Sequence, residues 1–355
     1  MIDRERTGGL SKGCLWCRCI PSYGVFVPAP PWRAPAAGRL SPTVNSGGCT
    51  HSPPSDTRMN PCRPFRLAAL VGASLLVVQP LLAPLSAQAT DRGALVIVGG
   101  GAQPIELVDE FVKLAGGSGK ARIVVFAMAS ASGDTSGEEK AEQLRTRGAR
   151  ARNVWINRAQ ADLDSVVHLL DSATGIWFGG GDQNRLTTSL LGSKVLQAIR
   201  ARHAAGAVVG GTSAGAAVIS TPMITGTELA LGSDSSEAWT RVKQGTVQVD
   251  SGFAFITDAI IDQHFLRRKR QNRLLSLVLA SPPHLGAGID EGTAIIVEPS
   301  GLWRILGTSA VLIVDAREAQ RTTVNPAVLG ASSVRMHLLP SGATFDPKTG
   351  QATLR

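Results

Sequence analysis

The chain has 355 residues, with 36 Lys and Arg against 27 Asp and Glu, and a formal net charge of +9. Most of the basic excess precedes residue 90: residues 90–355 hold 27 basic and 24 acidic side chains, a net charge of +3. The charge of the chain is therefore no argument for a nucleic-acid partner. All five cysteines lie at or before Cys62, so residues 90–355 cannot form disulfides. These 266 residues are enough for one α/β domain with a sizeable core.

The first 89 residues are expected to be outside the working protein. Residues 1–58 are proline-rich and aperiodic, which predicts a non-native or disordered extension upstream of Met59. They contain Cys14-x-x-Cys17-x-Cys19, but no second pair follows at zinc-finger spacing, so no metal site is expected.

Residues 59–89 are predicted to be a signal peptide. Basic residues precede an apolar run, and Ala87-Gln-Ala89 ends it with the small residues that signal peptidase requires. A membrane anchor is the alternative, but the run is short and contains Pro80 and Pro84. We expect export, to the periplasm or beyond, after cleavage near Ala89, with no stable membrane insertion.

From residue 90 to the serine turn described below, apolar runs of strand length alternate with stretches of helix length. This alternation, with continuous apolar strands, predicts a parallel sheet covered by helices on both faces. The predicted strands are Ala94–Val98, Ala121–Ala127, Asn153–Ile156, Gly175–Phe178 and Ala207–Val209. The predicted helices are Pro104–Leu114, Glu138–Arg147, Gln160–Leu170 and Gln183–Ala205.

The pattern changes after the serine turn. Residues 225–252 are polar and predict a loop, followed by a strand at Ala259–Ile261 and a helix at Arg267–Leu279. Several short strands then predict antiparallel additions to one edge of the sheet. They are Ala294–Val297, Trp303–Leu306, Ala310–Val314 and Val334–Leu339.

The stretch Gly211-Thr-Ser-Ala-Gly215 is the most informative motif. It lies between two apolar runs, which predicts a strand, a sharp turn and a helix with Ser213 at the apex. Glycines on both sides allow the backbone to bend and pack closely. An ordinary glycine turn is the alternative in a chain with 39 glycines, but this setting favours a nucleophilic serine.

A serine nucleophile needs a general base, and His264 is the best candidate. It follows a predicted strand within Asp262-Gln-His-Phe265. Carboxyl ends of parallel strands gather at one edge, where we expect the serine turn as well. The remaining histidines after residue 90 fall in predicted surface, loop or late-strand positions: His168, His203, His284 and His337.

The next strand end supplies an acid to orient the imidazole. Asp290 and Glu291 are adjacent, so in extended chain their side chains point to opposite sides and only one is expected to reach His264. Either of them is alternatively a turn cap. The residues alone leave the choice open.

Two further features suit acyl transfer. Amides of Gly180 or Gly181, together with that of Ala214, are candidates for an oxyanion hole. A phosphate loop is disfavoured there because Asp182 follows and no Lys-Ser or Lys-Thr pair does. The basic run between Arg267 and Arg273 suits substrates with free carboxylates, although such a run is often only a solvated face.

These motifs, in this order, resemble the cyanophycinase family of serine peptidases. The resemblance extends from about Gly93 to the end of the chain. It rests on Phe178–Gln183, Gly211–Ala216, Asp262–Phe265 with the following arginines, and Gly288–Glu291. It implies a three-layer α/β sandwich of the flavodoxin-like or class I glutamine amidotransferase-like type. It also implies hydrolysis of cyanophycin, a poly-aspartate with arginine on each β-carboxyl, to β-Asp-Arg dipeptides.

The resemblance also implies residue roles. Ser213 would be the nucleophile, His264 the base and Glu291 the acid. Matching positions of the family's substrate pocket are Gln183, Asp262, Gln263, Arg268, Arg270 and Arg273. The chain departs from the family at Gly179, which replaces a common threonine, and at Gly99–Gln103, which lacks the acidic residues often found there. Both departures bear on polymer specificity more than on the chemistry.

Three rival functions remain open. A peptidase of the same fold that cleaves aspartyl or isoaspartyl dipeptides differs in substrate, and an α/β-hydrolase esterase would use His337 as base. A secreted binding protein would have kept the pocket without turnover. No metal or organic cofactor is implied, the expected partner is a peptide or polymer rich in Asp and Arg, and a homodimer is what the family suggests.

Overall fold

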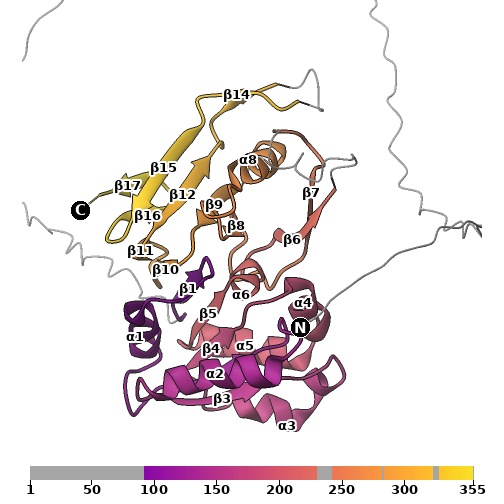
Figure 1. Cartoon of the computed structure of the whole chain (residues 1–355), viewed down its shortest axis with the longest axis vertical. Helices are drawn as coiled ribbons and strands as arrows, with labels where there is room; N and C mark the ends of the chain where they lie inside the picture. The colour runs from indigo at the N-terminus through magenta and orange to yellow at the C-terminus, as the bar shows by residue number, and fades with distance from the viewer. Residues whose placement is uncertain (1–91, 230–241, 282–283, 323–327, 355) are drawn as a thin grey trace, which may run out of the picture. The chain divides into compact units, whose positions relative to one another are not determined.

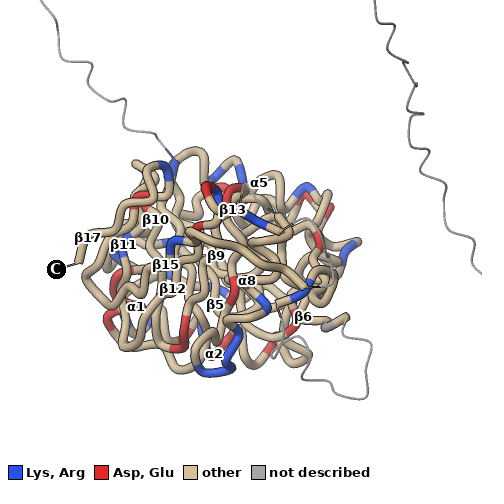
Figure 2. Tube along the Cα trace, turned by 90° about the horizontal axis from the view of Figure 1, so that it is seen from above, with Lys and Arg blue, Asp and Glu red and all other residues tan. Residues whose placement is uncertain are grey.

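The computed structural model describes residues 92–229, 242–281, 284–322 and 328–354, all within one compact unit, Leu81–Arg355. Both predicted leader segments, the cysteines and part of the predicted 225–252 loop lie outside the described residues. Within the described ranges, no helix has both the length and the apolar character needed to cross a membrane. Basic and acidic residues are interspersed along the trace (Figure 2).

A nine-stranded sheet, in the order β17-β16-β11-β10-β1-β5-β4-β2-β3, carries the serine turn. Its five strands from β1 to β3 are parallel, and the rest are added antiparallel at the β1 edge. The parallel strands are β1 Leu95–Val98, β2 Arg122–Phe126, β3 Arg150–Val154, β4 Gly175–Phe178 and β5 Val208–Thr212. The added strands are β10 Thr293–Val297, β11 Trp303–Gly307, β16 Thr344–Asp346 and β17 Gln351–Thr353.

A six-stranded sheet, in the order β15-β12-β9-β8-β6-β7, was not expected from the sequence. It is formed by β6 Met223–Glu228, β7 Val247–Asp250, β8 Ala259–Gln263, β9 Leu285–Ile289, β12 Ala310–Asp315 and β15 Arg335–Pro340. A short pair, β13 Gln320–Arg321 and β14 Ala331–Ser332, is separate. The strand ending before His264 therefore belongs to a different sheet from the strand ending before Ser213, contrary to the single-sheet expectation.

The helices and the second sheet form layers on the first sheet (Figure 1). The helices α1 Ile105–Leu114 and α2 Gly133–Arg145 cover one face, burying Phe111 and Leu144 against alternate residues of β1, β2 and β4. The other face packs on α4 Gln183–Leu190, α5 Lys194–Ala204, α6 Ala214–Ala217 and the inner face of the second sheet. The outer face of the second sheet is covered by α8 Gln271–Ala280. The α/β sandwich with a mostly parallel sheet is thus confirmed.

Local differences from the predicted elements have physical causes. The predicted helix Gln183–Ala205 is two helices, because Gly192 has a φ of +72° and Ser193 caps α5 by accepting from the Leu196 amide. The helix expected from Arg267 begins only at Gln271, after Lys269 with a φ of +53°. The predicted helix Gln160–Leu170 consists of η1 Gln160–Asp162, α3 Asp164–Val167 and η2 His168–Leu170.

Candidate active site

Ser213 lies between β5 and α6 in a strained backbone conformation, with φ +54° and ψ −112°. The turn is possible because its glycines let three elements touch. A Cβ on Gly211 would lie 2.3 Å from the Gly215 carbonyl oxygen, and a Cβ on Gly215 would lie 2.1 Å from the Phe178 carbonyl oxygen. Strain of this kind in a tightly determined backbone is typical of functional sites.

His264 comes to Ser213 from the end of β8 in the second sheet. The Ser213 Oγ lies 2.8 Å from His264 Nε2, and Glu291 Oε1 lies 2.6 Å from His264 Nδ1. His264 also has a positive φ, +49°, and its amide donates to the Gly99 carbonyl at 2.7 Å. With Nδ1–H donating to Glu291, Nε2 is free to accept the serine proton.

The adjacent acids have different partners. Glu291 contacts the imidazole, whereas Asp290 accepts from the Arg267 amide at 2.9 Å and from the Ser309 hydroxyl at 2.7 Å. The two side chains diverge, as expected for adjacent residues. The structure thus places Glu291, rather than Asp290, against His264, and Asp290 holds the turn that follows the histidine.

Burial lowers the pKa of His264; the hydrogen bond that Nδ1 donates to the Glu291 carboxylate raises it, and the Arg268 charge lowers it further, so the net shift is downward. The imidazole is therefore neutral, and able to act as a base, at neutral pH. Because the charge of Arg268 changes the pKa of His264, this exposed side chain lies close enough to interact electrostatically with the imidazole.

A loop after β1 holds the imidazole and carboxylate in place. A Cβ on Gly100, whose φ is +107°, would lie 2.3 Å from His264 Cε1. A Cβ on Gly101 would lie 2.9 Å from the Glu291 Cβ. In the sequence, this glycine run stands out only as a departure from the family pattern. Its glycines instead allow the backbone to lie against the imidazole and its acid.

Of the predicted oxyanion donors, Gly180 and Ala214 lie at the serine. A Cβ on Gly180 would be 3.5 Å from Ser213 Cβ, and Ala214 is the first residue of α6. Gly181 instead packs on the backbone, since its Cβ would lie 2.2 Å from the Ala129 carbonyl oxygen. Its predicted role as a donor stays a prediction.

Four of the residues matched to a substrate pocket form a buried network next to His264 in the chain: Asp262, Gln263, Arg270 and Arg273. Asp262 is fully buried, and both of its carboxylate oxygens accept from Arg273, at 2.8 and 2.5 Å. Arg270 donates to the Gln263 side chain at 2.9 Å. Gln183, also buried, donates to the Ile224 carbonyl at 2.9 Å, which ties α4 to β6. Their direct contact with substrate stays a prediction; Arg268 is the exposed member of the set.

The other histidines have other partners. His168 pairs with Asp171, His203 with the Ala207 carbonyl and His284 with the Ser281 hydroxyl. His337 lies on β15, packed against Phe345. Across the described part of the chain, no group of three or more His, Cys, Asp or Glu side chains is arranged to hold a metal ion.

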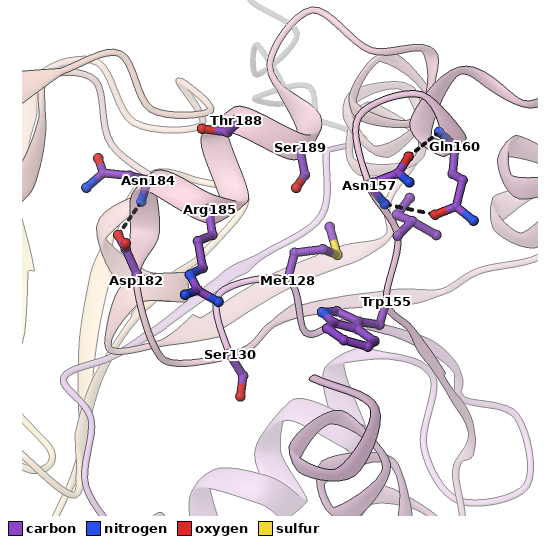
Figure 3. A pocket seen from close by; sticks show the side chains of 11 residues that line it. Met128, Ser130, Trp155, Asn157, Gln160, Asp182, Asn184, Arg185, Thr188 and Ser189 are labelled. Carbon is purple, nitrogen blue, oxygen red and sulfur yellow. Dashed lines mark hydrogen bonds between the residues drawn. The ribbon is translucent and has the colours of Figure 1, made fainter. Parts of the chain in front are cut away.

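A pocket of about 670 Å³ lies beside the Gly179–Asp182 turn (Figure 3). Trp155 and Met128 form an apolar wall, and Asp182 and Arg185 bring opposite charges to the rim. The Asp182 carboxylate also caps α4, accepting from the Asn184 amide at 2.8 Å. Sequence reasoning did not find this pocket, because Trp155 and Arg185 come from separate elements.

The fold and the serine–histidine–glutamate arrangement define a serine-type hydrolase. The sequence model of peptidase family S51 matches residues 95–305. The chain is 32% identical over 288 residues to the cyanophycinase of Synechococcus elongatus, covering 78% of this chain and 86% of that protein. It is 34% identical over 270 residues to the cyanophycinase of a Nostoc species, covering 73% and 86%.

The chain therefore belongs to peptidase family S51, the serine peptidases that include these cyanophycinases. Among solved structures, a peptidase from an acI-B1 actinobacterium has a similar fold, with a TM-score of 0.52 and 21% identity. The match covers 72% of this chain and 97% of that structure. The resemblance read from the motifs is thus confirmed at the level of the family.

Proposed function

We propose that the protein hydrolyses cyanophycin or a closely related β-Asp-Arg polymer through an acyl-enzyme on Ser213. The observation that carries the proposal is the chain of contacts from Ser213 Oγ to His264 Nε2, at 2.8 Å, and from His264 Nδ1 to Glu291, at 2.6 Å. The named relatives supply the substrate class, since they are cyanophycinases.

In the proposed mechanism, His264 takes the Ser213 proton as Oγ attacks the scissile carbonyl. Glu291 stabilises the imidazolium and keeps Nε2 toward the serine. The amides of Ala214 and Gly180, two residues next to Ser213, are the proposed donors to the developing oxyanion. The imidazolium then gives its proton to the leaving amine, and a water activated by the same imidazole releases the acyl group and restores the serine.

An arginine-bearing substrate suits the surroundings of the site. Every unit of a β-Asp-Arg polymer carries a guanidinium and a carboxylate. The exposed Arg268 near the imidazole and the Arg185 and Asp182 side chains at the pocket of Figure 3 offer complementary charges. The flat Trp155 ring supports stacking of a guanidinium.

The test is hydrolysis of cyanophycin by the protein from residue 90 onward, with products measured by mass spectrometry. We expect β-Asp-Arg dipeptides from the wild type and loss of at least about 10³-fold in rate for Ser213→Ala. The comparison of His264→Ala with His337→Ala is the matched control, because only the first should abolish labelling by a fluorophosphonate probe. Preferential cleavage of free aspartyl dipeptides would instead favour the dipeptidase function.

We further propose that the protein is exported with removal of residues up to about Ala89. The basis is the signal-peptide pattern of residues 59–89 alone. Expression in a bacterial host, followed by fractionation and N-terminal sequencing, tests it. A mature chain beginning near Thr90 outside the cytoplasm is expected, and an uncleaved cytoplasmic chain would contradict export.

A further inference from the structure

Lys140, on α2, places its amine in a second, smaller pocket of about 380 Å³. The Nζ donates to the side-chain oxygens of Gln103 at 2.7 Å and Gln143 at 2.8 Å, and lies 4.3 Å from the centroid of the Trp177 ring. No carboxylate among the described residues lies within ion-pairing distance of it. Burial lowers the pKa of Lys140 to about 7.

This pocket adjoins the proposed reaction centre. Thr212 and Gly180 both line it; Thr212 immediately precedes Ser213, and a Cβ on Gly180 would lie 3.5 Å from Ser213 Cβ. Trp177 Nε1 and Thr212 Oγ1 have no hydrogen-bond partner within the described part of the chain. Trp177 is itself only 2% exposed. The wall of the pocket next to the serine therefore contains buried polar atoms that lack hydrogen-bond partners.

The cation at this pocket differs from the arginines near His264 in its partners. The Arg273 guanidinium already pairs with the Asp262 carboxylate, whereas the Lys140 amine makes its hydrogen bonds to neutral amides and lies over an aromatic ring. A partly buried cation without a carboxylate in ion-pairing distance is costly to keep, and a substrate carboxylate bound there would offset that cost. A carboxylate forms a short, charge-assisted hydrogen bond with an ammonium.

We propose that Lys140 is a specificity-determining residue that binds a free carboxylate of the substrate unit next to the scissile bond. This deepens, and rests on, the proposed hydrolysis of a β-Asp-Arg polymer, in which every arginine retains its α-carboxylate. The unit placed on the Gly180 side of Ser213 would present that carboxylate to the Lys140 amine, across the pocket that Thr212 and Gly180 line.

The first test compares two short β-Asp-Arg oligomers, one with free arginine carboxylates and one with carboxamides. We expect Lys140→Met to raise the KM of the acid oligomer by about ten- to a hundredfold, with a much smaller change in kcat and none for the carboxamide. Lys120→Met, at an exposed lysine, is the control and should change neither. Equal effects on both oligomers, or no effect on either, would overturn the proposal.

The second test is the pH profile. In the wild type, kcat/KM for the acid oligomer should fall as pH rises through about 7, because the amine loses its charge there. The carboxamide should lack this fall, and Lys140→Arg should abolish it while keeping the preference for the acid. Glu139 is the other ionisable side chain of this pocket, and Glu139→Gln separates its contribution. An identical alkaline fall for both oligomers would overturn the assignment.

Binding separates this proposal from the proposed hydrolysis. Calorimetric titration of Ser213→Ala, with and without Lys140→Met, needs no turnover. Preference for the acid oligomer that disappears in the double variant supports Lys140 as the carboxylate site even if the wild type hydrolyses neither oligomer, which would contradict only the proposed hydrolysis. Hydrolysis with unchanged acid preference in Lys140→Met would overturn only the role of Lys140. Absence of binding by Ser213→Ala to both oligomers would also overturn it.

Discussion

The two sheets hold their reacting side chains by different means. The first sheet fixes Ser213 through the backbone: glycine contacts between β5, α6 and β4 leave no room for an added carbon atom. The second sheet fixes His264 through side chains, with a fully buried Asp262–Arg273 ion pair near it and Asp290 holding the turn after it. The nucleophile is therefore held by close packing, whereas the base is held by balanced charge in addition to close contact with the backbone of Gly100.

The largest loss of activity is expected from a change at Glu291, in the connection between the two sheets. Glu291→Gln keeps the shape of the side chain but removes the charge that stabilises the imidazolium, so kcat/KM should fall by about 10³- to 10⁴-fold. Steady-state hydrolysis measures this. Asp290→Asn is the matched control, since Asp290 contacts the Arg267 amide and Ser309 rather than the imidazole. Comparable losses for the two variants would mean that contact with His264 is not what matters.

The charge balance of the second sheet is tested by Arg273→Met. Removing the guanidinium leaves the buried Asp262 carboxylate without its main partner, which should lower the free energy of unfolding by about 3–5 kcal/mol. Chemical denaturation at neutral pH provides the measurement. Adding Asp262→Leu should recover part of the loss, because no unpaired carboxylate then remains. A double variant less stable than Arg273→Met would contradict this account.

Close packing at the base is tested by Gly100→Ala. The new Cβ would collide with the His264 ring and displace it, so kcat should fall by about ten- to a hundredfold. Gly117→Ala is a matched control: Gly117 also has a positive φ, +84°, but nothing lies within 4 Å of its Cβ position. Both variants carry the backbone strain of an alanine at positive φ, and only Gly100→Ala should lose activity. Equal activity in the two would exclude the collision.

The smallest expected effect is a shift in the pH at which protonation of His264 lowers kcat/KM. Because the pKa of His264 lies below its ordinary value, the imidazole gains a proton only at a correspondingly lower pH. The value of kcat/KM for the carboxamide oligomer should therefore stay level as pH falls past about 6.5 and then drop about tenfold per unit. Arg268→Gln removes a positive charge and should move the midpoint upward. A midpoint above the ordinary histidine value would contradict the role of burial.

Much of the fold was predictable where the residues of a single strand identify it as a strand. The strands β1, β2, β4 and β5 are largely apolar runs buried on both faces, and their predicted bounds agree with the structure to within three residues. The second sheet was not predictable in this way. In β9, Gly286 and Gly288 interrupt the apolar pattern because α8 side chains and Phe265 pack directly against that backbone.

The same distinction applies to the site residues: those in local motifs were predictable, and those that depend on distant partners were not. Ser213 and His264 follow strands in short, readable motifs, and the resemblance singled out Glu291. The buried ion pair, the contact of Gly100 with the imidazole and the burial of the Lys140 amine depend on partners that are distant in sequence. Helix α2 gives no local sign that Lys140 is covered, because the Trp177 ring beneath it comes from β4.

Glu291 lies in the short connection between β9 of the second sheet and β10 of the first. As the chain leaves the ribosome, the serine turn emerges about fifty residues before the histidine, and the carboxylate comes later still. A nascent chain that has assembled only its parallel strands thus contains Ser213 without His264 and Glu291 beside it. Under the proposed mechanism, hydrolysis therefore requires that both sheets have folded and packed together.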